Sequence, residues 1–232
     1  MAPDPLLGAC GTTPVLSPKS ISHALRRRSR WGQPPTSTDG KEHSVPTYQL
    51  IQRQELTSPA SSVVLTNFSG YTDLVLRIVA RDTRSNSNGD DIIFRLNSDG
   101  VSTGKYGYHA YYNSSTSSGQ IPFGADYGTN INYGFFGVAS SSGQDGNPST
   151  VFGSMEVHLP NYTSSAYKVI GAKSELPAQT DTTITRAQSG SQWWWANQWQ
   201  DTAAISTITL YNGASVNFVA GSSFSVYGIL KA

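Results

Sequence analysis

The sequence lacks several features that would place it in large protein classes. It contains one cysteine, Cys10, in 232 residues. A disulfide within the chain and a thiolate metal cage are therefore excluded. No apolar run approaches the roughly 18 residues that a transmembrane helix requires, so we expect no membrane span.

Charged residues are also scarce, at 13% of the chain. The helix-favouring residues Glu and Lys are few, whereas Gly, Ser, Thr and Asn are abundant. This composition favours short strands joined by turns. The net charge is only +1, which gives no basic excess of the kind that binds nucleic acid or an anionic membrane.

Familiar catalytic and cofactor motifs are missing as well. The four histidines have no metal-ligand spacing, and no phosphate-binding glycine loop occurs. The pattern G-x-S-x-G occurs once, at 100–104, but it lies between two expected strands and lacks the following helix that a nucleophile elbow requires. A glycosidase would need two carboxylates at a defined separation in a cleft. Six of the fifteen acids of this chain fall instead in stretches that read as turns: Asp90, Asp99, Asp126, Asp145, Asp181 and Asp201. We therefore expect no enzymatic activity, no cofactor and no metal site.

Residues 1–46 differ in composition from the rest of the chain. They hold seven of the twelve prolines and the basic cluster RRRSR at 26–30, and their net charge is +3, from six basic and three acidic residues. Such a segment cannot bury enough apolar surface to fold alone. We interpret it as an extended arm that contacts a partner subunit. Arginines bind carboxylates in a bidentate manner, which favours this reading over contact with a nucleic-acid backbone. The expected contact residues are Arg26, Arg27, Arg28, Arg30 and Trp31.

From residue 47 onward, strand-like runs alternate with turn signals. The expected strands are 48–56, 62–68, 73–81, 91–97, 105–113, 130–139, 151–160, 166–172, 183–187, 191–200, 204–212 and 222–230. No stretch keeps a helical apolar period, so helix content should be low. So many short strands imply two packed antiparallel sheets. The predicted fold is all-β: an antiparallel two-sheet β-sandwich of jelly-roll type at 47–232, preceded by the extended arm at 1–46.

Tryptophan is concentrated in one short stretch. Four of the five tryptophans occur in SQWWWANQWQ at 191–200. In a strand, successive side chains point to opposite faces, so Trp193, Trp195 and Trp199 share one face and Trp194 lies on the other. We expect the first three to pack within the sandwich. Trp194 is expected in a subunit interface, with sugar stacking as the alternative.

The segment YGYHAYY at 106–112 supplies a second aromatic group. Tyr108 and Tyr112 share one face of the expected strand, and Tyr111 lies on the other. Flat rings with a polar tip suit sugar stacking. The alternative is that these tyrosines are ordinary strand residues of the core. The candidate glycan-stacking residues are Trp194, Tyr108, Tyr111 and Tyr112.

Three segments carry a family resemblance. They are YQLIQRQELTSPASSVVLTNFSGYTDLVLRIVAR at 48–81, MEVHLPNYTSSAYKVI at 155–170 and WQDTAAISTITLYNGASVNFVAGSSFSVYGIL at 199–230. Together they resemble the small β-rich virion structural proteins of tailed bacteriophages, a family that also occurs as a domain within tail-fibre-like proteins. Neither the arm at 1–46 nor the run 193–195 matches the family's pattern.

The resemblance implies a virion protein that is exposed on the particle as capsid decoration or cement, or as a tail or fibre component. Its partners would be other virion proteins, with the arm clamping neighbouring subunits in a homo-oligomer such as a trimer. The alternative function is a carbohydrate-binding module that holds a host-surface glycan; a depolymerase ranks last. The expected location is the virion, with neither a membrane nor nucleic acid as partner.

Overall fold

The computed structural model describes residues 48–85, 89–113, 123–141, 150–176 and 192–230. These ranges contain twelve β-strands and no helix. The strands are β1 (Tyr48–Glu55), β2 (Ser62–Thr66), β3 (Asp73–Ala80), β4 (Gly89–Leu96), β5 (Tyr106–Asn113), β6 (Phe123–Ile131), β7 (Gly134–Ser140), β8 (Gly153–Leu159), β9 (Lys168–Glu175), β10 (Gln192–Trp199), β11 (Thr207–Asn212) and β12 (Ser223–Ile229). No helix that could cross a membrane was found in the described ranges.

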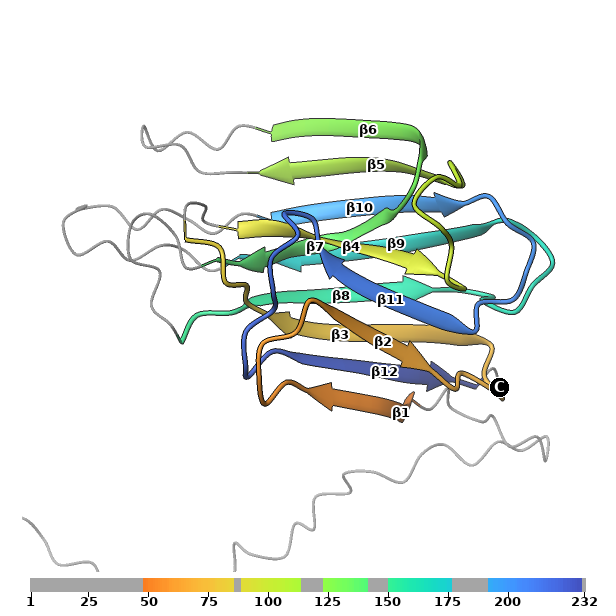
Figure 1. Cartoon of the computed structure of the whole chain (residues 1–232). Helices are drawn as coiled ribbons and strands as arrows, with labels where there is room; N and C mark the ends of the chain where they lie inside the picture. The colour runs from red at the N-terminus through yellow and green to blue at the C-terminus, as the bar shows by residue number, and fades with distance from the viewer. Residues whose placement is uncertain (1–47, 86–88, 114–122, 142–149, 177–191, 231–232) are drawn as a thin grey trace, which may run out of the picture. The chain divides into compact units, whose positions relative to one another are not determined.

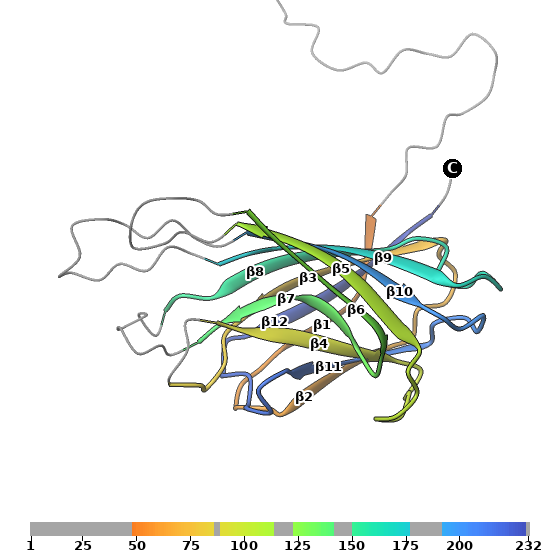
Figure 2. The same ribbon diagram turned by 90° about the horizontal axis from the view of Figure 1, so that it is seen from above.

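The strands form two antiparallel sheets. The large sheet has eight strands in the order β1-β12-β3-β8-β9-β10-β5-β6, and the small sheet has four in the order β2-β11-β4-β7. In Figure 1 the small sheet lies in front of the large one, and Figure 2 shows the two layers from above. The predicted all-β, two-sheet sandwich is confirmed. The predicted arm at 1–46 lies outside the described residues.

The strand order suggests how the sandwich is built. The strands β1-β12-β3-β8 and β2-β11-β4-β7 alternate between the two sheets along the chain. We interpret this alternation as a jelly roll of eight strands. The remaining strands, β9, β10, β5 and β6, extend the large sheet beyond β8, so that β5 and β6 project past the small sheet in Figure 1. The extension thus has an inner face that the small sheet only partly covers.

The core lies between the sheets and follows strand alternation. In β8 the side chains of Met155, Val157 and Leu159 are buried, while the three polar residues between and before them are exposed. In β12 the inward residues Phe224 and Val226 are fully buried. Both inner faces follow from strand geometry, because a period of two places every second residue on the core side.

Strand β7 closes one edge of the sandwich. All seven of its residues are buried, and it lies against β8, β9 and β10 of the large sheet. Glycines permit this close approach. A Cβ at Gly137 would lie 2.4 Å from the Cβ of Ser174, and one at Gly134 would lie 2.3 Å from the Phe94 ring. Gly137 also has a φ of +147°, which disfavours any L side chain.

Among the described residues the sequence misplaced one strand, whereas the expected strand at 183–187 lies outside them. The expected strand at 130–139 spans the end of β6, a turn and most of β7, and β6 itself was not expected. The segment that forms β6, FGADYGTNI, contains two glycines and Asp126, which indicate a turn when read locally. The segment is nevertheless a strand because it pairs with β5 over Tyr106 to Asn113. Asp126 and Asp90 therefore lie in strands, and their assignment to turns was wrong.

Candidate functional site

The tryptophans of β10 divide between the two faces of the large sheet. Trp195 and Trp199 are 5% and 0% exposed, and Trp193 is partly buried against the core. Trp194 points to the opposite face and is 37% exposed. The alternation expected from the sequence is therefore observed, and only the inward three share a face with Asn197.

Trp199 serves the scaffold. Its Nε1 donates a 2.7 Å hydrogen bond to Asp99 Oδ2, and the Tyr106 hydroxyl donates to the same oxygen at 2.8 Å. Lys105 Nζ binds the other carboxylate oxygen at 3.0 Å. The Asp99 side chain is 7% exposed. A buried carboxylate thus ties the end of β10 to the start of β5 and to the loop after β4.

Six aromatic side chains form one continuous surface, which we call the aromatic surface. They come from β5, β10, β7 and the turn before β7: Tyr108, Tyr112, Tyr133, Phe135, Trp193 and Trp195. Tyr112 stacks on Trp193 at 4.3 Å, Trp193 on Trp195 at 5.5 Å, and Trp195 on Phe135 at 4.8 Å between ring centroids. Tyr108 and Tyr133 pack on Phe135 at 4.7 and 5.3 Å. The series runs from the projecting strands to the edge of the small sheet.

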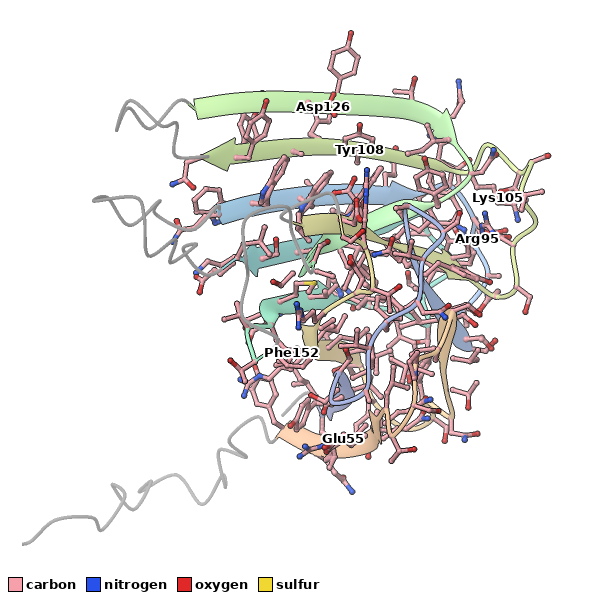
Figure 3. All side chains as sticks on the ribbon, turned by 60° about the vertical axis from the view of Figure 1, so that its left-hand side comes forward. Glu55, Arg95, Lys105, Tyr108, Asp126 and Phe152 are labelled. Atoms are coloured by element: carbon pink, nitrogen blue, oxygen red, sulfur yellow. The ribbon has the colours of Figure 1, made fainter. Side chains whose placement is uncertain are left out.

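The glycines of β6 give the tyrosines room on this face. An ideal Cβ at Gly124 would lie 2.1 Å from the Tyr112 ring, and one at Gly128 would lie 2.5 Å from the Tyr108 ring. Asp126 stands between these glycines and accepts a 2.9 Å hydrogen bond from the Tyr108 hydroxyl. Figure 3 labels Tyr108 and Asp126 on the neighbouring strands β5 and β6. Burial, with this hydrogen bond as a further cause, raises the pKa of Tyr108 to about 12.

An acidic pocket adjoins the aromatic surface at the edge of the small sheet. It has a volume of 260 Å³ and shares Tyr133 and Phe135 with that surface. Asp90 and Asp91 of β4 also line it, together with Arg84, which forms an ion pair with Asp90. Burial raises the pKa of Asp91 to about 6, and the charges of Asp90 and Asp126 act in the same direction. The Asp126 carboxylate therefore lies within electrostatic range of the pocket.

This raised pKa makes stability depend on pH. The folded-state pKa of Asp91 lies above its usual value of 3.8, so the native state binds the proton more tightly than the unfolded state between about pH 4 and 6. The contribution of the Asp91 carboxyl group to the free energy of unfolding must therefore fall as pH rises through that window. We expect Asp91→Asn to increase the free energy of unfolding at pH 7 by about 1 to 2 kcal/mol, with the gain vanishing toward pH 3. Urea unfolding across pH 3 to 8 measures this; a gain confined to acid pH would contradict it.

The outer face of the same strands carries a separate aromatic group. Tyr111 lies opposite Trp194 in the sheet and is 62% exposed. Tyr127 of β6 is 72% exposed and stacks on His109 at 6.1 Å. On its other side Trp194 lies opposite Lys173 of β9. This face is flat and solvent-exposed in the described part of the chain.

The candidate residues chosen from sequence are thus not one site. Tyr108 and Tyr112 lie on the inner aromatic surface, whereas Trp194 and Tyr111 lie on the outer face. A single stacking platform made of all four is excluded, because the sheet separates the two pairs. The arm candidates Arg26, Arg27, Arg28, Arg30 and Trp31 lie outside the described residues. In the described ranges no group of three or more metal-ligating side chains was found.

Sequence reasoning missed several members of the inner site. Trp193 was assigned to the core, although it is only partly buried. Asp91 and Asp126 were not selected, since nothing in their local sequence separates them from other acids. One signal was present: Gly124 and Gly128 flank Asp126 with a period of two, which leaves one face of a strand free of side chains apart from the acid.

Comparisons with known proteins assign no family to the chain. No family model matches it, and no curated protein matches it. Among solved structures it is similar to a β-fructofuranosidase from Schwanniomyces occidentalis, solved in complex with fructosyl-erythritol. The identity is 10%, the match covers 79% of this chain and 34% of that one, and the TM-score is 0.20. The chain spans about a third of the enzyme's length, and a likeness this weak carries no argument about function.

One expectation is corrected here. The sequence led us to expect no enzymatic activity, but a solved structure to which the chain is similar is an enzyme. The classification as a non-enzyme is therefore withdrawn. The same similarity assigns neither an activity nor a catalytic residue to this chain, because its TM-score is 0.20.

Proposed function

We propose that the chain is a structural protein of a tailed-phage virion, exposed on the particle as capsid decoration or as a tail or fibre component. One observation carries the proposal. The segments that resemble the phage family, 48–81, 155–170 and 199–230, contain all of β1, β2, β3, β11 and β12 and most of β8, which are six of the eight strands that we interpret as the jelly roll. Of the extension, β5, β6 and most of β9 and β10 lie outside these segments. The resemblance to the phage family thus lies mainly in the eight-strand sandwich and not in the extension of the large sheet.

The proposed partners are neighbouring virion subunits, including copies of this chain. The flat outer face of the extension offers exposed rings, Trp194, Tyr111 and Tyr127, of the kind that is enriched in protein interfaces. The basic arm at 1–46 would supply a second contact by ordering on a neighbouring subunit. An extended segment gains affinity over a long surface at the expense of ordering entropy.

Virion incorporation tests this proposal. In a phage that lacks its own copy of the gene, complementation with the chain deleted for 1–46, or with Trp194→Glu, should lower the copy number per particle by at least about tenfold, because a buried charge opposes the interface. Gln198→Glu, also exposed on β10, is the matched control and should be incorporated normally. Quantitative mass spectrometry of purified particles gives the ratio. Normal copy numbers for both test variants would refute the proposed contacts, and absence of the unaltered chain from particles would refute the virion role.

A second candidate function is carbohydrate binding to the host surface. The aromatic surface favours it, because three of its rings, Trp193, Tyr108 and Tyr112, are only partly buried, and Tyr108 donates a hydrogen bond to the Asp126 carboxylate. Small-ligand sites typically combine aromatic walls with a few polar groups that fix orientation. The two functions are compatible, since a particle component can both assemble and bind a glycan.

A further inference from the structure

We infer that the inner face of β10, β5 and β6, with the adjoining pocket at the edge of the small sheet, binds an uncharged polysaccharide segment. This inference rests on the second proposed function and names its site and ligand class. The site comprises the aromatic surface, the 260 Å³ pocket and the carboxylate of Asp126. It excludes Trp194 and Tyr111, which lie on the other side of the sheet.

The rings of the candidate site differ from those of the core in their exposure. In the core, rings such as Phe94 and Phe136 stack between the sheets and are fully buried. Tyr108 and Tyr112 lie on β5, which projects past the small sheet in Figure 1, and Trp193 lies on the neighbouring β10; all three stay partly exposed. Partly exposed aromatic side chains next to polar groups can pack on the C–H faces of a sugar ring. They continue the stacked series that begins at the buried Phe135 and Trp195.

Polar groups border the aromatic rings of the site. The Asp126 carboxylate accepts one hydrogen bond, from Tyr108, and retains further acceptor positions. Asp91 lies within the charge field of Asp126 at the neighbouring pocket. Sugar hydroxyls both donate and accept, so carboxylates along one aromatic strip suit a polyhydroxylated ligand.

The charge of the site indicates which glycans fit. Asp90, Asp91 and Asp126 place three carboxylates along the strip, against the single guanidinium of Arg84, which already pairs with Asp90. An anionic polysaccharide would meet like charges at short range, which disfavours its binding. Uncharged hexose polymers carry no such penalty, and their hydroxyls can donate to the carboxylates.

The aromatic surface is held in place before any ligand binds. The Tyr108 and Tyr112 rings lie over Gly128 and Gly124, where side chains on β6 would displace them. The hydrogen bond to Asp126 fixes the tip of Tyr108, and Trp193 fixes the ring of Tyr112. A preformed surface loses little conformational entropy on binding. The glycines of β6 therefore help to preform the binding surface, because they leave room for the two tyrosine rings.

A printed array of purified bacterial polysaccharides, both uncharged and anionic, tests the inference with the full chain. We expect retention on at least one uncharged polysaccharide and none on the anionic ones. The uncharged polysaccharide with the strongest signal then serves in affinity electrophoresis. Trp193→Ala and Tyr112→Ala should each weaken binding at least about tenfold, since aromatic anchors dominate such contacts. Asp126→Asn lies on an exposed strand position, preserves the side-chain shape and should weaken binding at least about fivefold.

The outer-face variants Trp194→Ala and Tyr111→Ala are the matched controls and should bind as the unaltered chain does. If they abolish binding while the inner-face variants retain it, the assigned site is wrong although carbohydrate binding stands. If no polysaccharide is retained, both the site and the second proposed function fail, and if only anionic polysaccharides are retained, the assigned ligand class is wrong. The virion role is judged separately, because Trp193→Ala, Tyr112→Ala and Asp126→Asn should leave incorporation into particles unchanged.

Discussion

Replacement of Asp99 by alanine should lower the free energy of unfolding by about 3 to 4 kcal/mol, the largest single effect that we expect from a polar residue. The Asp99 carboxylate accepts from Trp199 Nε1 at 2.7 Å and from the Tyr106 hydroxyl at 2.8 Å, and it pairs with Lys105 at 3.0 Å. Trp199 and Tyr106 are both fully buried. Truncation would leave two buried donors without an acceptor, which costs far more than the loss of an exposed ion pair.

Two companion variants separate the causes of that loss. Asp99→Asn keeps an acceptor oxygen but removes the charge, and it should lose about half as much stability. Asp201→Ala removes the other carboxylate bound to Lys105, at 2.7 Å, and should lose less than about 1 kcal/mol because that group is more exposed. The midpoint and slope of guanidinium unfolding measure all three. Equal losses for Asp99→Ala and Asp201→Ala would show that the ion pair with Lys105, and not the buried donors, carries the effect.

Replacement of Asn197 by alanine should lower the free energy of unfolding by about 2 to 4 kcal/mol. The side-chain amide of Asn197 joins the two sheets. Its Oδ1 accepts from the backbone N–H of Phe135, and its Nδ2 donates to the carbonyl of the same residue, both at 2.8 Å. Phe135 belongs to β7, an edge strand of the small sheet. Without the amide, a buried N–H and a buried C=O have no partner at that edge.

Asn197→Asp provides a stringent comparison. A carboxylate can accept from the Phe135 N–H but cannot donate to its carbonyl, so at pH 7 this variant should be at least as unstable as Asn197→Ala. Gln198→Ala, at the neighbouring exposed position, should change stability by less than about 0.5 kcal/mol. Hydrogen exchange of the Phe135 amide adds a local readout, with faster exchange expected in both Asn197 variants. Unchanged protection would contradict the bridging role.

The polar residues that hold the sandwich together could not be selected from sequence. Asp99 was correctly placed outside a strand, yet its partner Trp199 is 100 positions away along the chain. Asn197 lies on the same face of β10 as Trp195 and Trp199, but its partner Phe135 is 62 positions away along the chain. Neither pairing leaves a local pattern, because the strand order that creates it is long-range: β10 lies between β9 and β5.

What the sequence determined by itself is the alternation within each strand. The period of two separated Trp194 from Trp193, Trp195 and Trp199, and it separated Tyr111 from Tyr108 and Tyr112, because successive side chains of a strand point to opposite faces. Composition was sufficient for the all-β class, since few residues favour helix.

Only the tertiary structure decided which faces meet. It placed Tyr108 and Tyr112 on the inner side of a projecting sheet and Trp194 and Tyr111 on the outer side. It also turned a glycine-rich stretch into β6, the strand that brings Asp126 to Tyr108. The physical reason is that pairing between strands distant in sequence, and not local propensity, fixes the register and the neighbours of each side chain.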